Sequence, residues 1–302
     1  MLYLIDASVY VFRAYYSMPP DMLDREGNAA HALFGFARFL GDLIERAKPR
    51  YLAVAFDESL ETSFRNRIDP TYKANREPAP ADLKLQFGRC REFCEHLGVA
   101  HFGSGEYEAD DIIGTLHARF RREGLPATLV TRDKDLAQLV REGDVYWNYT
   151  ENLRLQHHEI EGHFGVAPER YADYLALTGD AVDNIKGVPG VGPKTAAVLL
   201  KEFASLEELY DNLEEVARLP IRGAAKLPQR LETHKDQAFL ARRLTEIARD
   251  MPLAAERDSL RPRKPDLTSL EAFFDRHNFG PMLRRQSLRL AELAASTERP
   301  AA

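Results

Sequence analysis

The chain has 302 residues, of which 44% are hydrophobic and 29% charged, which is typical of a globular protein with one large domain or a domain and an appendage. The formal net charge of −6 excludes no class of partner, because acidic and basic residues are concentrated in different parts of the chain. No apolar run approaches the roughly 20 residues of a membrane span and no leader precedes the first apolar run, so we expect a cytoplasmic protein without a membrane partner.

The first half of the chain alternates predicted strands with predicted helices. Residues 2–6 are a short apolar run that ends in an acid, and residues 51–57 and 125–133 repeat this pattern. Between the first two runs, residues 31–47 carry apolar side chains at helical spacing. This alternation predicts an α/β fold, a parallel twisted sheet flanked by helices.

The predicted strands end in acids, and this places Asp6, Asp57 and Asp133 at one edge of the sheet. Sites in such sheets form beyond the carboxyl ends of the strands. Any single one of these acids could instead cap a following helix. Capping alone does not explain three of them facing the acids at the start of a further predicted helix.

Residues 104–135 form a predicted helix followed by a strand, with groups of acids where the helix begins and just after the strand. Like charges at close range repel and raise each other's pKa, so such a cluster does not stabilise a fold. Divalent cations among the carboxylates would remove that cost, and we therefore expect a carboxylate-only metal site that performs phosphoryl chemistry. Five acids of this stretch are the candidate ligands: Glu108, Asp110, Asp111, Asp133 and Asp135.

Residues 61–82 differ in character, because prolines interrupt regular structure while basic and aromatic residues alternate. Two interpretations stay open: a solvated loop, or a mobile basic segment that meets phosphate groups. The basic and aromatic residues are Phe64, Arg65, Arg67, Tyr72, Lys73 and Arg76.

The composition becomes helical from Pro168 onward. A predicted helix ends near Gly179 and is followed by Asp180 and Asp183, and a glycine-rich stretch over residues 187–192 then leads into another helix. The stretch matches neither a nucleotide P-loop nor a dinucleotide fingerprint. A helix–hairpin–helix that grips a duplex phosphate backbone fits it better than a plain helical turn, which needs only one glycine.

The expected division is an α/β core over residues 1–165 with an arch segment at about 61–100, a helical subdomain over 166–290, and a flexible tail over 291–302.

Cys90 and Cys94 lie four apart in a predicted helix without partners at zinc-site spacing, so we expect reduced, structural thiols.

These motifs, in their order and spacing over roughly residues 2–285, resemble the 5′–3′ exonuclease and flap endonuclease family, which includes the 5′ nuclease domain of bacterial DNA polymerase I. No polymerase region follows, so the resemblance is to a stand-alone form or an excised domain. The matching pieces are Leu-Ile-Asp-Ala-Ser8, Ala-Phe-Asp57, Ser63-Phe-Arg65, Tyr72-Lys-Ala-Asn-Arg76, Tyr-Glu-Ala-Asp-Asp111, Thr-Arg-Asp-Lys-Asp135, Leu177-Thr-Gly-Asp-Ala-Val-Asp-Asn184 and the run from Gly187 to Ala196.

The resemblance implies roles for individual residues. Lys73 and Arg76 fall where the family contacts phosphate at the base of a helical arch, and together with Asp133 they are the expected catalytic residues. Phe34 matches a position where an aromatic ring could stack on a base. The expected metal ligands are Asp6, Asp57, Glu108, Asp110, Asp111, Asp133, Asp135, Asp180 and Asp183. The remaining expected substrate contacts are Arg65, Tyr72, Gly187, Val188, Gly190, Val191, Gly192, Lys194 and Thr195.

The resemblance also implies cofactors and partners. Two or more Mg²⁺ ions are expected at the acids, with Mn²⁺ as an alternative, and K⁺ is expected at the glycine-rich hairpin. The expected substrate is DNA with a 5′ end, a nick or a 5′ flap, cut by a two-metal-ion mechanism during replication and repair. The protein is expected to act as a monomer in a bacterial-type cytoplasm, associated with the nucleoid.

Two rival functions and three departures from the family pattern complete the expectations. A haloacid-dehalogenase-like phosphatase would need an acid at position 8, where Ser8 stands, and a non-catalytic DNA-binding relative would not need the full set of acids. Glu106 adds an acid beside the motif and Lys186 replaces a common proline. Arg132 stands where many relatives have a small residue, and it could add a phosphate contact or a salt bridge within the cluster.

Overall fold

The computed structural model describes residues 1–58 and 62–297. The expected arch segment begins at residue 61 and the expected tail ends at residue 302, so part of each lies outside the described residues. The elements of the first 165 residues are β1 (Leu2–Asp6), α1 (Ala7–Ser17), α2 (His31–Ala47), β2 (Tyr51–Asp57), α3 (Arg65–Ile68), α4 (Ala81–His96), β3 (Ala100–Ser104), α5 (Ala109–Arg122), β4 (Ala127–Val130), the 3₁₀ helix η1 (Lys134–Leu139), β5 (Val145–Asn148), β6 (Leu153–Gln156) and α6 (His157–Phe164).

These strands form one six-stranded sheet in the order β3-β2-β1-β4-β5-β6. β1 pairs in parallel with β2 and β4, β2 with β3, and β4 with β5. The predicted α/β fold with a mostly parallel sheet is therefore confirmed. The antiparallel edge strand β6 was not predicted from the sequence.

The central strands form where the sequence is apolar on both faces of the sheet. All five residues of β1 except Tyr3 are buried, and so are the first six residues of β2. The apolar stripe of α2 lies against the sheet, and this helix has the predicted bounds. Because each pattern is local, the predicted ranges 2–6, 31–47 and 51–57 agree with the structure.

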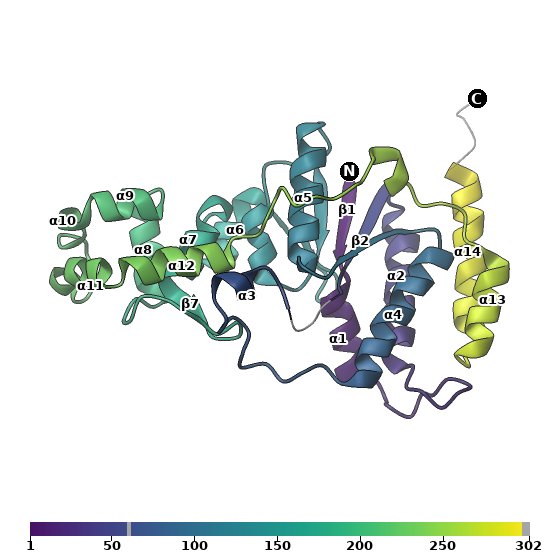
Figure 1. The fold of residues 1–302 in the computed structure, drawn as a ribbon. Coiled ribbons are helices and arrows are strands. Elements are labelled where there is room, and N and C mark those ends of the chain that lie inside the picture. Colours follow the sequence, from purple (N-terminus) through teal and green to yellow (C-terminus); the bar gives the residue numbers. More distant parts are fainter. Residues whose placement is uncertain (59–61, 298–302) are drawn as a thin grey trace.

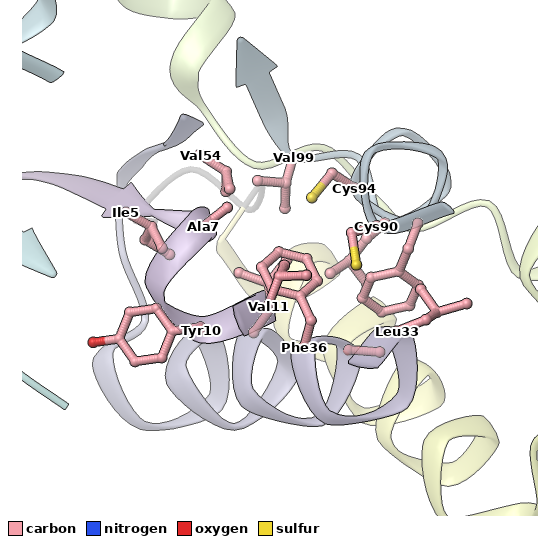
Figure 2. Packing of buried hydrophobic residues seen from close by; sticks show 14 of the residues in the cluster. Ile5, Ala7, Tyr10, Val11, Leu33, Phe36, Val54, Cys90, Cys94 and Val99 are labelled. Atoms are coloured by element: carbon pink, nitrogen blue, oxygen red, sulfur yellow. The ribbon is translucent and has the colours of Figure 1, made fainter. Parts of the chain in front are cut away.

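Helices cover both faces of the sheet (Figure 1). One hydrophobic cluster joins the sheet to α1, α2 and α4, and a second joins it to α5, η1 and α6. Figure 2 shows the first cluster, in which Cys90 of α4 lies toward Leu33 and Phe36 of α2, and Cys94 lies beside Val99. Both thiols are free and buried, which agrees with the expectation of reduced, structural cysteines.

A helical unit with its own hydrophobic cluster lies at one end of the molecule (Figure 1). Its helices α7, α8 and α12 pack around a short antiparallel hairpin of β7 and β8. The elements that follow residue 165 are η2 (Pro168–Arg170), α7 (Tyr171–Thr178), β7 (Gly179–Asp180), β8 (Ile185–Lys186), α8 (Pro193–Glu202), α9 (Leu206–Asp211), α10 (Leu213–Val216), η3 (Ala224–Lys226), α11 (Leu227–Thr233), α12 (Lys235–Thr245), η4 (Arg257–Leu260), α13 (Leu267–Arg276) and α14 (Pro281–Thr297).

The last two helices do not belong to the helical unit, although the expected subdomain reached residue 290. After α12 the chain returns along the α5 side, and α13 and α14 pack on the outer side of α2 and α4 (Figure 1). Phe273, Phe274 and Leu283 are buried there in the first cluster. Residues 291–297 continue α14 and are helical, whereas a flexible tail was expected from 291.

No helix in the described part of the chain is long and apolar enough to cross a membrane.

Candidate metal centre

A cavity of about 510 Å³ lies at the carboxyl edge of the parallel strands, next to the helical unit. Strand ends converge there because parallel neighbours all point their carboxyl ends to the same edge. The lining acids come from the ends of β1 and β2, the segment after β4, the start of α5 and the β7–β8 hairpin. Eight of the nine expected metal ligands line the cavity: Asp6, Asp57, Glu108, Asp110, Asp133, Asp135, Asp180 and Asp183.

Backbone and hydroxyl groups hold several of these carboxylates in place. Asp6 accepts hydrogen bonds from the Val9 N–H at 3.4 Å and from the Thr131 hydroxyl at 3.0 Å. Asp57 accepts the Ala109 N–H at 2.8 Å, which ties β2 to the first turn of α5. These donors fix the direction of each carboxylate without neutralising its charge.

The buried acids carry more negative charge than their surroundings balance. Burial, followed by the charges of Asp57 and Asp133, raises the pKa of Asp6 to about 8. Burial and the neighbouring acids also raise the pKa values of Asp110 and Asp135 well above the ordinary range. Within the described residues, the buried Oδ1 atom of Asp135 has no hydrogen-bond partner. Buried carboxylate oxygens that are close together suit divalent cations, because hard cations prefer oxygen ligands. Bound cations would offset the negative charge of the ionised acids.

The raised pKa values predict that the metal-free protein loses stability as the pH rises. A carboxyl whose folded-state pKa lies above the unfolded value of about 3.8 binds its proton more tightly in the folded protein, so its stabilising effect is complete below that value. The effect is lost as the pH rises toward the folded value of about 8 for Asp6. We expect the free energy of unfolding, measured by urea titration in EDTA, to fall between pH 5 and 8.

Divalent metal should reduce this fall, because bound cations favour the ionised carboxylates. A metal-free protein whose unfolding free energy stays level or rises from pH 5 to 8 would contradict the proposed accumulation of uncompensated charge.

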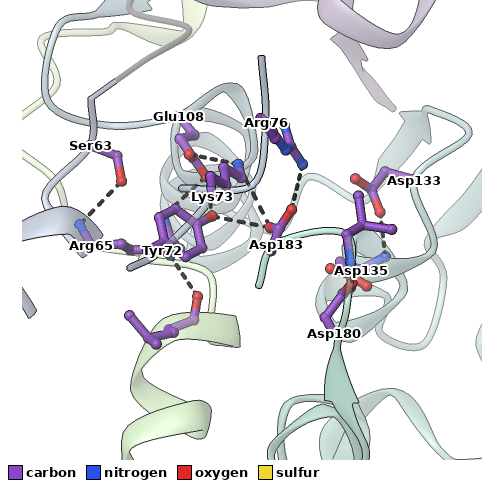
Figure 3. A network of polar contacts seen from close by, with 12 residues as sticks. Ser63, Arg65, Tyr72, Lys73, Arg76, Glu108, Asp133, Asp135, Asp180 and Asp183 are labelled. Carbon is purple, nitrogen blue, oxygen red and sulfur yellow. Dashed lines mark hydrogen bonds and ion pairs between the residues drawn. The ribbon is translucent and has the colours of Figure 1, made fainter. Parts of the chain in front are cut away.

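Two basic residues of the segment after α3 already lie among the acids (Figure 3). Lys73 Nζ is 2.7 Å from Glu108 Oε1 and 3.7 Å from Asp183 Oδ2, and Arg76 pairs with Asp183. Burial works to raise the pKa of Glu108, but Lys73 and then Arg65 outweigh it, so the net shift is downward. Lys73 has a φ of +55°, a conformation that few non-glycine residues adopt.

These ion pairs explain why the acids line one cavity without forming a complete set of metal ligands. Over residues 1–58 and 62–297, no three Asp, Glu, His or Cys side chains are already grouped as a complete metal site. Lys73 and Arg76 hold Glu108 and Asp183 to one side, while Asp133 and Asp135 lie across Asp183 from them in Figure 3. The arrangement therefore offers oxygen donors on opposite walls of a cavity.

Asp111 does not reach the cavity, although it was expected to bind metal. Both of its carboxylate oxygens are 2.8 Å from the guanidinium of Arg65, and it also accepts the Ala248 N–H at 2.9 Å. Arg65 further donates to the carbonyls of Leu244 and Glu246. Asp111 is fully buried and Arg65 is 3% exposed, so this pair ties α3 and α5 to the chain after α12. Arg65 thus has no free donors for a substrate, contrary to expectation.

Of the two aromatic residues expected to contact substrate, Phe34 lies away from the cavity and Tyr72 lines it. Phe34 does not line the cavity and instead packs edge-on against Phe279, with ring centroids 5.4 Å apart. Tyr72 does line it, but the ring is buried in the cluster of the helical unit. Its hydroxyl lies 3.0 Å from a Glu108 oxygen and 3.2 Å from an Asp183 oxygen, and the two carboxylates share its one proton. Tyr72 therefore orients two acids of the cavity.

The glycine-rich hairpin forms the tight connection between β8 and α8. Val188 and Val191 are buried, so they present only backbone to a ligand, whereas Gly190, Gly192 and Lys194 are exposed. Thr195 is half-buried in the first turn of α8, whose N-terminus is favourable for anions. Gly190 has a φ of +77°, which explains the glycine at that position.

Substitution of Gly187 by alanine is expected to destabilise the protein. A Cβ at this position would lie 2.5 Å from the Leu177 carbonyl oxygen and closer still to the backbone of Thr178 and Gly179. We expect Gly187→Ala to lower the free energy of unfolding by about 1–3 kcal/mol in urea titrations. The matched control is Gly192→Ala, because a Cβ there meets nothing within 4 Å and the φ is −94°. Equal stability of the two variants would contradict this account.

Several residues that line the cavity were not predicted from the sequence. Val9 and Phe12 of α1 form an apolar part of its wall, and Lys134 lies 3.8 Å from Asp180. Thr131 holds two acids of the cavity in place, because its hydroxyl donates to Asp6 and accepts the Asp133 N–H at 2.9 Å. The available signal was position, since Thr131 lies two residues before Asp133 and Lys134 lies between Asp133 and Asp135.

Two family models match consecutive parts of the chain: "5'-3' exonuclease, N-terminal resolvase-like domain" over residues 1–165 and "5'-3' exonuclease, C-terminal SAM fold" over residues 166–268. A 5'-3' exonuclease of Aquifex aeolicus is 34% identical over 89% of this chain and 89% of its own length. DNA polymerase I of Pseudomonas aeruginosa is 40% identical over 90% of this chain. The chain spans only 30% to 34% of the length of four DNA polymerase I relatives that it matches.

A similar fold occurs in a solved complex of bacteriophage T5 flap endonuclease with DNA and metal ions. That structure has a TM-score of 0.62 and 19% sequence identity, with 97% of this chain and 99% of the other covered. At this level of identity the likeness concerns the fold, which it shares from the sheet to the helical unit.

Proposed function

The chain belongs to the 5′–3′ exonuclease family, and on that premise we propose that it is a metal-dependent, structure-specific 5′ nuclease that hydrolyses phosphodiester bonds of DNA at 5′ ends, nicks and 5′ flaps. The observation that carries the proposal is the cavity lined by eight carboxylates, with Lys73 and Arg76 on its wall. Acids would bind cations there and the basic pair would bind a phosphate. A role in replication and repair follows from the substrate.

The acids fit two or more Mg²⁺ ions, with Mn²⁺ as an alternative. Glu108, Asp110, Asp133 and Asp135 would hold them with Asp6 and Asp57, while Asp180 and Asp183 would act through water or hold a further ion. When bound, such ions supply Lewis-acid activation of water and stabilisation of the leaving oxygen. The raised pKa values of Asp6 and Asp110 support this assignment, and so does the Asp135 Oδ1 atom, which has no hydrogen-bond partner among the described residues.

The protein's own cations would position the reacting phosphate. Lys73 is held beside the acids by Glu108 and by its backbone N–H, which donates to the Asp183 carbonyl at 2.9 Å. An incoming phosphate would compete for Lys73 and Arg76 and release Glu108 and Asp183 toward the cations. Charge-assisted hydrogen bonds from both side chains would then orient the phosphate. Val9 and Phe12 would keep water away from one side of it.

The helical unit is the proposed duplex-binding part. Its exposed hairpin around Gly190 and Gly192 and the start of α8 present backbone N–H groups and Lys194, which suits a phosphate backbone. The DNA in the T5 complex supports this proposal through the shared fold. We also keep K⁺ at the hairpin and a monomeric state as proposals. The proposed division sets the hairpin-containing unit after residue 165 apart from the core, with α13 and α14 counted in the core.

The test is a cleavage assay on three labelled DNA substrates: a free 5′ end, a nick and a 5′ flap. We expect product from at least one of them with Mg²⁺ or Mn²⁺ and none in EDTA. Binding to these substrates without cleavage under either metal would favour the rival, a non-catalytic DNA-binding relative. Absence of both binding and cleavage would overturn the proposal.

A further inference from the structure

One basic residue of the cavity is not held by the acids of the site. Four other basic residues each form an ion pair with one of the nine acids expected to bind metal: Arg65, Lys73, Arg76 and Lys134. Across residues 1–58 and 62–297, the ion pair found for Arg132 is instead with Glu151, at 4.0 Å. Its side chain is 41% exposed, and that of Glu151 is 60% exposed, so this pair contributes little. The structure thus does not support a salt bridge within the acidic cluster.

The backbone on either side of Arg132 is fixed, although its guanidinium is held only by the weak pair with Glu151 in the part of the chain that the structure describes. Thr131 N–H donates to the Trp147 carbonyl at 3.2 Å, and the Thr131 hydroxyl joins Asp6 and the Asp133 N–H. Arg132 therefore starts from a rigid point directly between two positions of the site and lines the cavity. The fixed backbone sets where the side chain of Arg132 begins, although binding a ligand would still order the side chain itself.

Arg132 also lies on a different wall from the other phosphate-binding candidates. Lys73 and Arg76 are on the side of Glu108 and Asp183, whereas Arg132 follows β4 and faces α1 and the β5–β6 turn that carries Glu151. Figure 3 shows Asp133, its chain neighbour, across Asp183 from Lys73. Tyr10 of α1 and Tyr146 of β5 both have raised pKa values caused mainly by burial, and the positive charge of Arg132 opposes both shifts.

From these observations we propose that Arg132 binds a backbone phosphate of the nucleic acid next to the reacting one, on the α1 side of the cavity. A guanidinium suits this role, because its planar set of donors binds phosphate oxygens in pairs. The strand would then be held from both walls, by Lys73 and Arg76 on one and Arg132 on the other. Arg132 would act as a positioning residue that contributes affinity. The proposal rests on the nuclease function proposed above.

The test compares binding of a labelled 5′-flap DNA in EDTA by fluorescence anisotropy over a series of salt concentrations. Arg132→Ala should raise Kd about tenfold and lower the slope of log Kd against log salt by about 0.7–0.9, the loss of one phosphate contact. Arg132→Lys should keep the slope and lose part of the affinity. The matched control is Arg122→Ala, an exposed arginine in the last turn of α5 outside the cavity, which should bind like the wild type.

Glu151→Gln separates phosphate binding from a structural role. If Arg132 acts through its ion pair, this variant should reproduce the defect of Arg132→Ala. If Arg132 binds phosphate, Glu151→Gln should bind DNA as tightly as the wild type or more tightly. Under turnover with Mg²⁺, Arg132→Ala should raise KM with kcat within about threefold, because the contact is the same before and during the reaction.

The proposal is overturned if Arg132→Ala matches the wild type in Kd and salt slope, or if Glu151→Gln shares its defect. A cooperative urea transition for each variant establishes folding, and Arg132→Gln serves if the alanine variant does not fold. Failure of the proposed nuclease function would give a different result. If the wild type binds DNA but never cleaves it, the nuclease function fails while the binding comparison still tests Arg132. If the wild type does not bind DNA, both the nuclease function and the role of Arg132 are overturned.

Discussion

Asp133→Asn is expected to abolish metal-dependent cleavage while DNA binding is retained. Asp133 lines the cavity and accepts the Asp135 N–H at 2.9 Å, a contact that the asparagine oxygen can keep. The substitution removes one negative charge from a site whose acids have raised pKa values, first through burial, so folding should be unaffected or slightly favoured. Loss of a ligand oxygen at the charge-stabilising centre should lower kcat for a 5′ flap by about 10³-fold or more.

The control for this prediction is Glu106→Gln, which removes the acid that directly precedes the Tyr-Glu-Ala-Asp-Asp111 motif. Glu106 is exposed, pairs with Arg67 and does not line the cavity, so cleavage should stay within about threefold of the wild-type rate. Flap cleavage gives the rates and fluorescence anisotropy gives the affinities. An Asp133→Asn protein that cleaves at the wild-type rate would overturn the assignment of this cavity as the catalytic centre.

Arg65→Ala is expected to cost about 3–5 kcal/mol of folding stability, the largest effect of any substitution considered for its structural role. The change leaves the carboxylate of Asp111 fully buried without its partner, and it also removes donors to the Leu244 and Glu246 carbonyls. The loss would loosen the connection between α5 and the chain after α12. Urea unfolding of the metal-free protein measures it.

The neighbouring pair offers the matched control. Arg67→Ala removes an ion pair with Glu106 in which both side chains are exposed, so stability should change by no more than about 0.5 kcal/mol. In a double-mutant cycle, Arg65→Ala combined with Asp111→Asn should cost less than the sum of the single changes. Normal stability of Arg65→Ala together with weakened DNA binding would instead restore the substrate-contact role that the sequence suggested.

The course of the central elements could be predicted from the sequence because the signal for each is local. An apolar run such as residues 51–57 can be buried on both faces of a sheet, and the stripe over 31–47 can only be buried as a helix. The same reasoning missed β3, whose residues are only half-buried, and the short pair β5 and β6. Their weak or brief patterns acquire meaning only beside neighbouring strands.

The convergence of the acids was also predictable, because parallel strands bring their carboxyl ends to one edge. The division of labour among the acids was not. Asp110 and Asp111 are adjacent, yet successive helical residues point about 100° apart, so one faces the cavity and the other faces Arg65. Which of the two turns inward depends on how α5 is rotated against the sheet, and no local pattern specifies that rotation.

The family, the mostly parallel α/β architecture and the edge at which the acids meet could therefore be predicted from the sequence alone, since these follow from local patterns and motif order. Which charged side chains are paired inside the protein, and which remain available to a ligand, became clear only in the tertiary structure. Arg65 is neutralised by contacts that include Leu244, 179 residues further along the chain, whereas Arg132 keeps an exposed guanidinium. Pairing of charges depends on distance in space, and distance in space depends on the packing of segments that are far apart in sequence.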